Sequence, residues 1–292
     1  MSTFERGHLL ARSLACYERS EGLDVRRDLE LVVVNDHSTD MTSALVADWS
    51  HRTGIRATVV LPCPKYVGWR DCGAVINAGI RASTGQYVLL THPEVMVGRQ
   101  SVATCVGVLA SFESGRYGHM EESIRQYPFG PYACCRVYYL SPRDQERLDT
   151  VPWKDEGVLA VRQVAGFYDE DANGNPDYTH RATDVVAQPG SRLPTWESWV
   201  FGGMSRETWK RLGGMLETQA WGSVDVAFRH RRQTLGIPNH TCPGDDTIVL
   251  HQNHDRSGDV PTDRDMNAWV KELKDFPLND ATKLVYPQVD FI

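Results

Sequence analysis

Four side chains that could do chemistry stand directly after short apolar runs of this sequence. Asp36 follows the first run, His92 and Glu94 follow a second, and His251 ends a third. In an open parallel sheet, ligands bind beyond the carboxyl ends of the strands. If the three runs are strands of one such sheet, we expect these four side chains to line a common cleft.

His92 and Glu94 offer an imidazole and a carboxylate two residues apart, and in an extended chain both point to the same side. Such a pair suits a divalent cation such as Mn²⁺, which accepts mixed nitrogen and oxygen ligands. His251, with His254 three residues further on, would complete a set of ligands drawn from distant segments. The alternative interpretation is a proline-containing turn with a surface glutamate, together with structural histidines.

Two aspartates have both a structural and a functional interpretation. Asp36 could accept a hydrogen bond from a base or a ribose, or it could cap the following helix, although Ser38 or Asp40 could also do the capping. Asp225 lies at the start of a predicted helix, where the helix dipole favours an acid. It could also act as the general base for a hydroxyl nucleophile.

The elements that would position these residues alternate between helix and strand over residues 1–115. Short β-branched runs indicate strands buried on both faces, and apolar stripes at helical spacing indicate helices. The predicted helices are 7–20, 41–52, 71–82 and 99–113, and the predicted strands are 29–34, 56–61 and 86–90. This alternation predicts an α/β fold with a doubly wound, mostly parallel sheet.

The second half of the chain is less regular and rich in Tyr, Pro, Gly and Asp. We predict strands at 133–140 and 247–251, a close-packed strand or bend at 201–204, helices at 206–212 and 224–235, and a short helix near 263–274. The segment 169–175 has some features of a calcium loop but lacks the closing Glu, which favours a solvated loop. We therefore divide the chain into a nucleotide-binding half (1–115), an irregular acceptor-side half of the same domain (116–257) and a C-terminal tail (258–292).

Composition narrows the classes of protein that fit. The 292 residues carry a net charge of −7, which argues against a generally basic nucleic-acid binder but leaves a local basic groove open, for example at Arg229–Arg232. The seven cysteines contain no CxxC pair, so neither a disulfide framework nor a zinc site is expected. The sequence has no apolar run long enough for a membrane span and no signal-peptide core at its N-terminus. We therefore expect a cytoplasmic protein.

The order of these motifs resembles glycosyltransferase family 2, which has the GT-A fold. Residues 32–40 (VVVNDHSTD) are similar to the family's VVDDGSTD-like turn, and residues 77–90 (NAGIRASTGQYVLL) are similar to the run that leads into its D-x-D metal motif. Further on, residues 201–214 and Trp221-Gly222-x-x-Asp225 resemble the acceptor-side stretch that ends in a W-G-x-E-D motif. The resemblance covers roughly residues 2–110 and 199–254.

The resemblance implies a metal-dependent, inverting transfer of a hexose or related sugar from a nucleotide-diphosphate sugar, UDP favoured, to an acceptor hydroxyl. It implies a Mn²⁺ or Mg²⁺ ion that neutralises the diphosphate leaving group. By position, Glu94 and His251 would be metal ligands and Asp225 the catalytic base. The donor would be bound by Asp36 on the uracil, Thr3 and Phe4 near the base, Arg70 and Asn77 by the nucleotide, and His92 at the first position of the D-x-D motif.

The sequence also departs from the family pattern. His-Pro-Glu replaces D-x-D, and Val224 replaces the Glu of the E-D pair. The family's first strand would precede Thr3, so we expect this strand either to be lacking or to be replaced by another segment.

Three other functions stay open. One is a non-catalytic module that binds a nucleotide or a sugar. Another is a glycosyltransferase whose acceptor is a hydroxymethylated base in viral DNA, reached by base flipping. The third is a nucleotidyltransferase, which is disfavoured because residues 35–40 contain no Gly, Lys or Arg.

Overall fold

This computed structural model describes residues 1–61, 72–116, 129–140, 145–146, 148–158, 200–215, 224–242 and 244–254. The α-helices are α1 (Gly7–Tyr17), α2 (Val25–Asp28), α3 (Thr42–Thr53), α4 (Cys72–Ala82), α5 (Ser101–Glu113), α8 (Trp153–Glu156), α11 (Arg206–Leu212) and α12 (Val224–Thr234). The strands are β1 (Ser2–Thr3), β2 (Glu30–Asn35), β3 (Arg56–Val60), β4 (Tyr87–Leu90), β5 (Val95–Val97), β6 (Tyr132–Cys134), β7 (Val137–Tyr139), β8 (Gly202–Ser205), β9 (Asn239–Thr241) and β10 (Val249–His251). Two short 3₁₀ turns, η2 (Leu148–Thr150) and η4 (Asp245–Thr247), complete the described elements.

The strands form three small sheets, with orders β1-β2-β3, β5-β10-β7 and β4-β8-β6-β9. The first sheet is parallel throughout. The other two mix parallel and antiparallel pairs. The alternation of helix and strand in the first half, and the α/β fold class, are confirmed.

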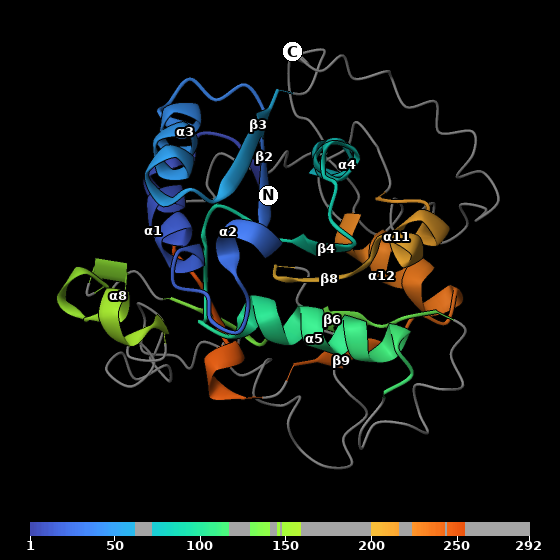
Figure 1. Cartoon of the computed structure of the whole chain (residues 1–292). Helices are drawn as coiled ribbons and strands as arrows, with labels where there is room; N and C mark the ends of the chain where they lie inside the picture. The colour runs from blue at the N-terminus through green and yellow to red at the C-terminus, as the bar shows by residue number, and fades with distance from the viewer. Residues whose placement is uncertain are drawn as a thin grey trace, which may run out of the picture.

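β2 shows why its apolar run forms a central strand. Leu31 and Val33 face the large core cluster that includes residues of α1 and α3. Val32 and Val34 face a second cluster with residues of α4. Helices thus cover both faces of the strand (Figure 1), and an uninterrupted apolar run is what such a position requires.

The N-terminus provides only two residues at the place of the expected first strand. Ser2 and Thr3 form β1, which pairs in parallel with Val34 and Asn35 of β2. The ladder begins at Met1, whose amine donates to the carbonyl of Val32 at 2.9 Å. A short strand therefore precedes Phe4.

The segment 133–140 was expected to be one strand, and this prediction was wrong. It forms β6 and β7, which belong to different sheets. The change of partner occurs at Cys135 and Arg136, where the N–H of Cys135 donates to the carbonyl of Phe201 and the carbonyl of Arg136 accepts from Val249. Two different neighbours therefore divide a run that looks continuous in sequence.

The predicted close-packed strand at 201–204 is confirmed as β8, the neighbour of both β4 and β6. A Cβ on Gly203 would lie 1.9 Å from the carbonyl oxygen of Val88, so only glycine fits there. The chain then enters α11, where the Ser205 hydroxyl accepts from the N–H of Thr208. Gly213 ends α11 with a φ of 79°.

Among the described helices, none is long and apolar enough to cross a membrane. The calcium-like segment 169–175, Arg70 and the tail 258–292 lie outside the described residues.

Candidate active site

Glu94, His251 and His254 bring their ligand atoms together at the end of the β5-β10-β7 sheet. All three ligand atoms lie within 4.8 Å of one another. The Oε1 of Glu94 is 3.6 Å from Nε2 of His251 and 3.8 Å from Nε2 of His254. The three side chains are at most 14% exposed. The predicted pairing of Glu94 with His251 is therefore brought together by the fold.

The antiparallel pairing of β10 with β5 places His251 opposite Val95, next to Glu94. The N–H of Gln252 donates to the carbonyl of Glu94 at 2.9 Å, which extends the ladder to this residue. Nδ1 of His251 lies 2.9 Å from the carbonyl oxygen of Gln252. A proton on Nδ1 would satisfy that contact and leave Nε2, the atom nearest Glu94, with a free lone pair for a metal.

Helix α1 fixes the loop that carries Glu94. The hydroxyl of Ser13 donates to the carbonyl of Pro93 at 2.5 Å, and the hydroxyl of Tyr17 donates to that of Thr91 at 3.0 Å. Gln252 reaches α1 from the other strand, because its amide donates to the carbonyl of Leu9. The loop and β10 are thus held against the same helix.

The surrounding charges keep the carboxylate of Glu94 ionised. Burial alone would raise the pKa of Glu94, but His251, together with the charge of His92, lowers this pKa to about 2. Burial lowers the pKa of His92, opposed by the charge of Glu94. At neutral pH the carboxylate is therefore ionised and the His92 imidazole neutral. His92 interacts electrostatically with the cluster, but its ring nitrogens are not among the three mutually close ligand atoms.

The donor set fits a divalent cation. Two ligands of one first-row ion, each about 2.1 Å from it, lie at most about 4.2 Å apart. The distances from Glu94 to the two histidines, 3.6 and 3.8 Å, fall within that limit. Two imidazoles and one carboxylate favour a borderline transition-metal ion over Mg²⁺, which prefers oxygen ligands and water.

The turn after β2 is tied to the residues that follow β1. The hydroxyl of Ser38 accepts from the N–H of Glu5 at 2.9 Å, and Oδ2 of Asp40 accepts from the N–H of Gly7 at 2.7 Å. Glu5 and His37 have positive φ angles of 50° and 62°, which are uncommon for residues with a side chain. The two loops thus form one cross-linked rim.

The residues expected near the base occupy this rim. Thr3 is buried, and its carbonyl accepts from the N–H of Asp36 at 2.9 Å. Phe4 is 58% exposed, one of the few large apolar side chains of the described structure that face water. The N-cap residue of α3 is Met41, which makes no side-chain cap hydrogen bond, and Oδ1 of the preceding Asp40 accepts from the N–H of Thr42, the first residue of the helix. Asp36 is therefore not needed as the cap.

Two further predicted site residues, Asn77 and Asp225, lie on helices α4 and α12. The side chain of Asn77 is buried, and its amide accepts from the N–H and donates to the carbonyl of Met215. It thus ties α4 to the segment after α11, and its role in nucleotide binding stays a prediction. Asp225 is the second residue of α12, as its predicted place at a helix N-terminus requires, and its role as base also stays a prediction.

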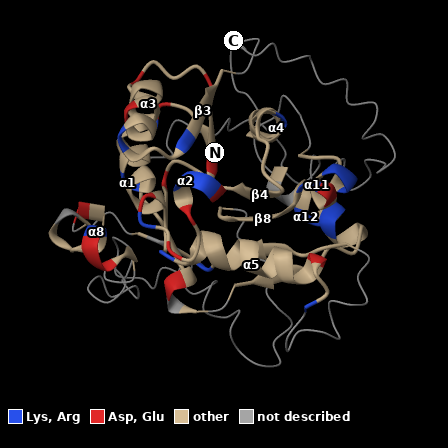
Figure 2. Ribbon diagram, viewed as in Figure 1, with Lys and Arg blue, Asp and Glu red and all other residues tan. Residues whose placement is uncertain are grey.

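Basic residues lie along α12 (Figure 2), and two of them make structural contacts. Arg231 donates to the carbonyls of Gly214 and Leu212. Arg232 is 1% exposed, donates to the carbonyl of Ile237 and lies 5.1 Å from the ring centre of Tyr132. Arg232 is therefore not part of a solvated basic face, because a carbonyl and an aromatic ring surround its guanidinium in place of water.

His254 completes the cluster with Glu94 and His251, although the family resemblance implied only those two as metal ligands. The only signal for it was its place three residues after His251. A second unexpected group is a set of three buried thiols, Cys105, Cys135 and Cys242, with Sγ atoms of Cys105 3.7 Å and 3.5 Å from the other two.

Comparison with known proteins shows the fold. No protein-family model matches the sequence, and no curated protein matches it by sequence. Many solved structures are similar to it, and three of them illustrate the likeness.

The first is the mannosyltransferase PcManGT from Pyrobaculum calidifontis in complex with GDP-Man and Mn²⁺, at 18% identity and a TM-score of 0.50 over 92% of this chain and 57% of that one. The second is residues 1–349 of S. aureus TarS in complex with UDP-GlcNAc, at 11% identity and a TM-score of 0.57 over 98% and 75%. The third is the glucosyl-3-phosphoglycerate synthase of Mycobacterium tuberculosis in complex with Mn²⁺, UDP-glucose and phosphoglyceric acid, at 15% identity and a TM-score of 0.50 over 94% and 78%. This chain therefore spans little more than half the length of the mannosyltransferase, and its fold is that of the GT-A-type, nucleotide-sugar-dependent glycosyltransferases.

Proposed function

We propose that this protein is a metal-dependent glycosyltransferase that moves a sugar from a nucleotide-diphosphate sugar to an acceptor hydroxyl. The observation that carries the proposal is the convergence of Glu94, His251 and His254 within a GT-A-type fold. The similar structures include complexes with GDP-Man, UDP-GlcNAc and UDP-glucose, two of them with Mn²⁺. A bound cation would neutralise the diphosphate that leaves with the nucleotide.

The rim formed by the turns after β1 and β2 is the proposed base-binding wall. The exposed ring of Phe4 offers a face on which a base can stack. Asp36 at the end of β2 would accept hydrogen bonds from the base, which favours a uracil N–H and hence a UDP sugar. The crosslinks from Glu5 to Ser38 and from Gly7 to Asp40 hold this wall before the donor arrives.

In the proposed reaction, Asp225 takes the proton from the acceptor hydroxyl. The acceptor oxygen then attacks the anomeric carbon, while the bond from that carbon to the diphosphate oxygen breaks. A single displacement of this kind inverts the configuration at the anomeric carbon. One base and one stabilised leaving group are sufficient, which is consistent with Val224 standing where the family pattern has a second acid.

The loss of that acid and of the D-x-D aspartates also favours a second candidate, a non-catalytic module that binds a nucleotide or a sugar. The similar structures give no support for DNA as the acceptor. The acceptor in the M. tuberculosis complex is phosphoglyceric acid, and no nucleic acid is named in the three complexes.

The test is a screen of nucleotide sugars for donor hydrolysis, with and without Mn²⁺, on the full chain and on Asp225→Asn. We expect Mn²⁺-dependent release of UDP from one UDP sugar. For Asp225→Asn we expect loss of transfer to an acceptor, with nucleotide affinity within about twofold of wild type. Nucleotide binding without turnover of any donor would replace the enzyme by the binding module. Near-normal transfer by Asp225→Asn would remove Asp225 as the base.

A further inference from the structure

Cys105, Cys135 and Cys242 form a cluster of thiols, which we call the thiol cluster, in the core beneath α5. Cys105 lies on α5, Cys135 directly follows β6 and Cys242 directly follows β9. All three are buried, and their Sγ atoms lie within 4.8 Å of one another. No CxxC pair signals this cluster in the sequence, because Cys105 is 30 and 137 residues away from the other two.

The spacing of the sulfurs matches that of ligands to one metal ion. Sulfurs at about 2.3 Å from a tetrahedral Zn²⁺ lie about 3.8 Å from one another. The Sγ of Cys105 is 3.7 Å from that of Cys135 and 3.5 Å from that of Cys242. Thiolates are soft ligands that select Zn²⁺ or Cu⁺ over Mn²⁺ and Mg²⁺. The thiol cluster therefore differs in its metal preference from the cluster at Glu94.

The backbone holds two of the three cysteines in place by hydrogen bonds. The N–H of Cys135 donates to the carbonyl of Phe201 at 3.2 Å, and the N–H of Cys242 donates to the carbonyl of Cys134 at 2.8 Å. The sulfurs are thus brought together by the fold itself, which is the preorganisation that a metal site requires.

His240 supplies a second observation that points to a ligand. It stands two residues before Cys242, so in the extended chain of β9 the two side chains point to the same face. Its Nε2 is buried and has no hydrogen-bond partner among the described residues, although a buried nitrogen of this kind normally has one. Cysteines can fill a core as small apolar side chains, but such packing leaves the histidine nitrogen unexplained. The ring nitrogens of His240 are not among the mutually close ligand atoms, so His240 would reach an ion by rotation of its side chain.

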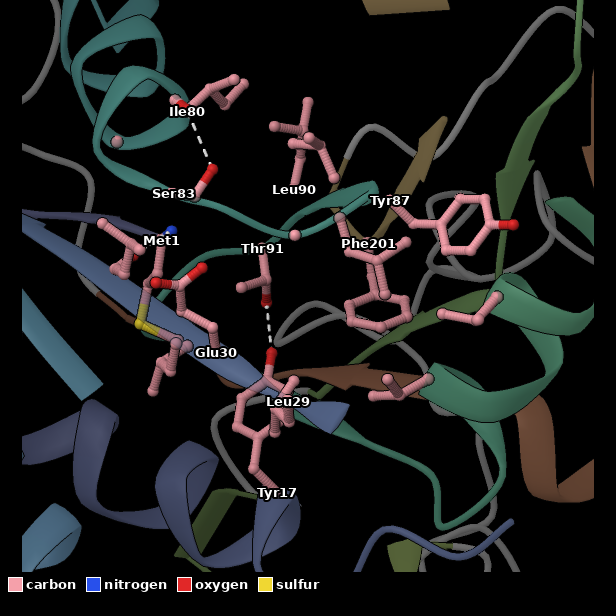
Figure 3. Close-up of a pocket in the computed structure, with 18 of the residues that line it drawn as sticks. Met1, Tyr17, Leu29, Glu30, Ile80, Ser83, Tyr87, Leu90, Thr91 and Phe201 are labelled. Atoms are coloured by element: carbon pink, nitrogen blue, oxygen red, sulfur yellow. Dashed lines mark hydrogen bonds between the residues drawn. The ribbon is translucent and has the colours of Figure 1, made fainter. Parts of the chain in front are cut away.

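The thiol cluster is also closed off from the open pocket of the protein. That pocket lies between β2 and β4 and is lined by Phe201 and by Val102 of α5, but by none of the three cysteines (Figure 3). We therefore expect an ion to bind while the chain folds, as is usual for structural metal sites.

We propose that Cys105, Cys135 and Cys242 hold one structural Zn²⁺ ion, with His240 as the fourth ligand. On binding, each thiol loses its proton to solvent and a metal–sulfur bond forms, without any change of oxidation state. The ion would join α5, the junction at which residues 133–140 change sheets, and the segment that leads from β9 to β10. The site is separate from the cluster at Glu94 and does not depend on glycosyl transfer.

The first test uses the full chain, unfolded and then refolded in a phosphine reductant with Co²⁺ as a spectroscopic substitute for Zn²⁺. We expect one Co²⁺ per chain with thiolate-to-metal charge-transfer absorption, and we expect Zn²⁺ to displace it. Ligands without sulfur give no such band, so an ion at Glu94 does not contribute. His240→Gln should keep this band but shift the visible Co²⁺ bands, because water replaces a nitrogen ligand. Unchanged visible bands would overturn the assignment of His240.

The matched pair of variants is Cys105→Ser and Cys134→Ser. Cys134 is also buried, but it faces a different core cluster, and its Sγ lies 3.5 Å from Oδ1 of Asn239. Loss of a residue that only supports a metal ligand costs about 10–100-fold in metal affinity. We therefore expect Cys105→Ser to weaken Zn²⁺ binding by more than about 100-fold, and Cys134→Ser to leave it unchanged.

The second test measures stability in the Glu94→Gln background, where the other cluster lacks its carboxylate. Saturating Zn²⁺ present during refolding should raise the melting temperature by about 5–10 °C. Adding Cys242→Ser to this background should reduce the shift below about 2 °C.

The wild type alone is sufficient to overturn the proposal, whether or not the cysteine variants fold. Refolded wild type with neither a sulfur band nor bound Zn²⁺ would overturn it, as would a full sulfur band in Cys105→Ser. A metal-free protein whose intact mass is lower by two hydrogens would replace the metal site with a disulfide.

Discussion

Replacing Glu94 by Gln tests whether the Glu94–His251–His254 cluster is a metal site. A ligand present at one hundred times its dissociation constant stabilises the native state by about 2.7 kcal/mol. For a chain of this size, each kcal/mol shifts the melting temperature by about 2–4 °C. We therefore expect saturating Mn²⁺ to raise the melting temperature of the wild type by about 5–10 °C.

Glu94 is the only anionic side chain of the three, and its pKa of about 2 makes it fully charged at neutral pH. Glu94→Gln keeps the shape of the side chain but removes the charge, so we expect the Mn²⁺-induced shift to fall below about 2 °C. The matched control is Glu207→Gln, because Glu207 is 65% exposed on α11 and pairs with Arg211. The assay is differential scanning fluorimetry, with free Mn²⁺ counted by electron paramagnetic resonance.

A Glu94→Gln protein that keeps the full Mn²⁺ shift would refute the assignment of this carboxylate as a ligand. Loss of the shift in Glu207→Gln as well would show that the cation acts through general surface charge. The pH dependence of stability gives an independent check when wild type and Glu94→Gln are compared without metal. The lowered pKa of Glu94, from 4.5 to about 2, corresponds to about 3 kcal/mol of native stability above pH 4.5, which is lost as the pH falls toward 2.

Three further predictions follow from buried groups. Arg232→Ala should lower the free energy of unfolding by about 2–4 kcal/mol in chemical denaturation, because it removes a buried, hydrogen-bonded cation. In contrast, Lys210→Ala, at an exposed position of α11, should change it by less than about 0.5 kcal/mol. Burial lowers the pKa of His92 from 6.5, so this imidazole binds a proton more weakly in the native state than in the unfolded chain. Native stability should therefore fall as the pH drops below about 6.5, and His92→Gln should flatten this dependence in pH-resolved urea titrations. Burial raises the pKa of Cys16 and Cys134 to about 12, so both thiols should react with a disulfide reagent at pH 8 only after unfolding, and fast labelling of either in the native protein would contradict their burial.

The sequence by itself determined the local elements of the first half. The apolar run of β2 predicts a strand buried on both faces, because each of its alternating side chains needs an apolar neighbour. The polar turn after it predicts a helix start, and within the turn Oδ1 of Asp40 accepts from the first N–H of α3. Gly203 and Gly213 indicate a close backbone approach and a helix end for reasons of steric space alone. These features depend on neighbours within a few residues, so they can be read without the fold.

The tertiary structure alone decided which of these elements meet. Glu94 and His251 become neighbours through the register of β10 on β5, a strand of three residues that is too short to recognise in sequence. Arg232 reads as solvated in a basic run, and only the packing of α12 on Tyr132 makes it buried. Each of these outcomes depends on contacts between distant segments, and no local pattern of residues encodes the distance between them.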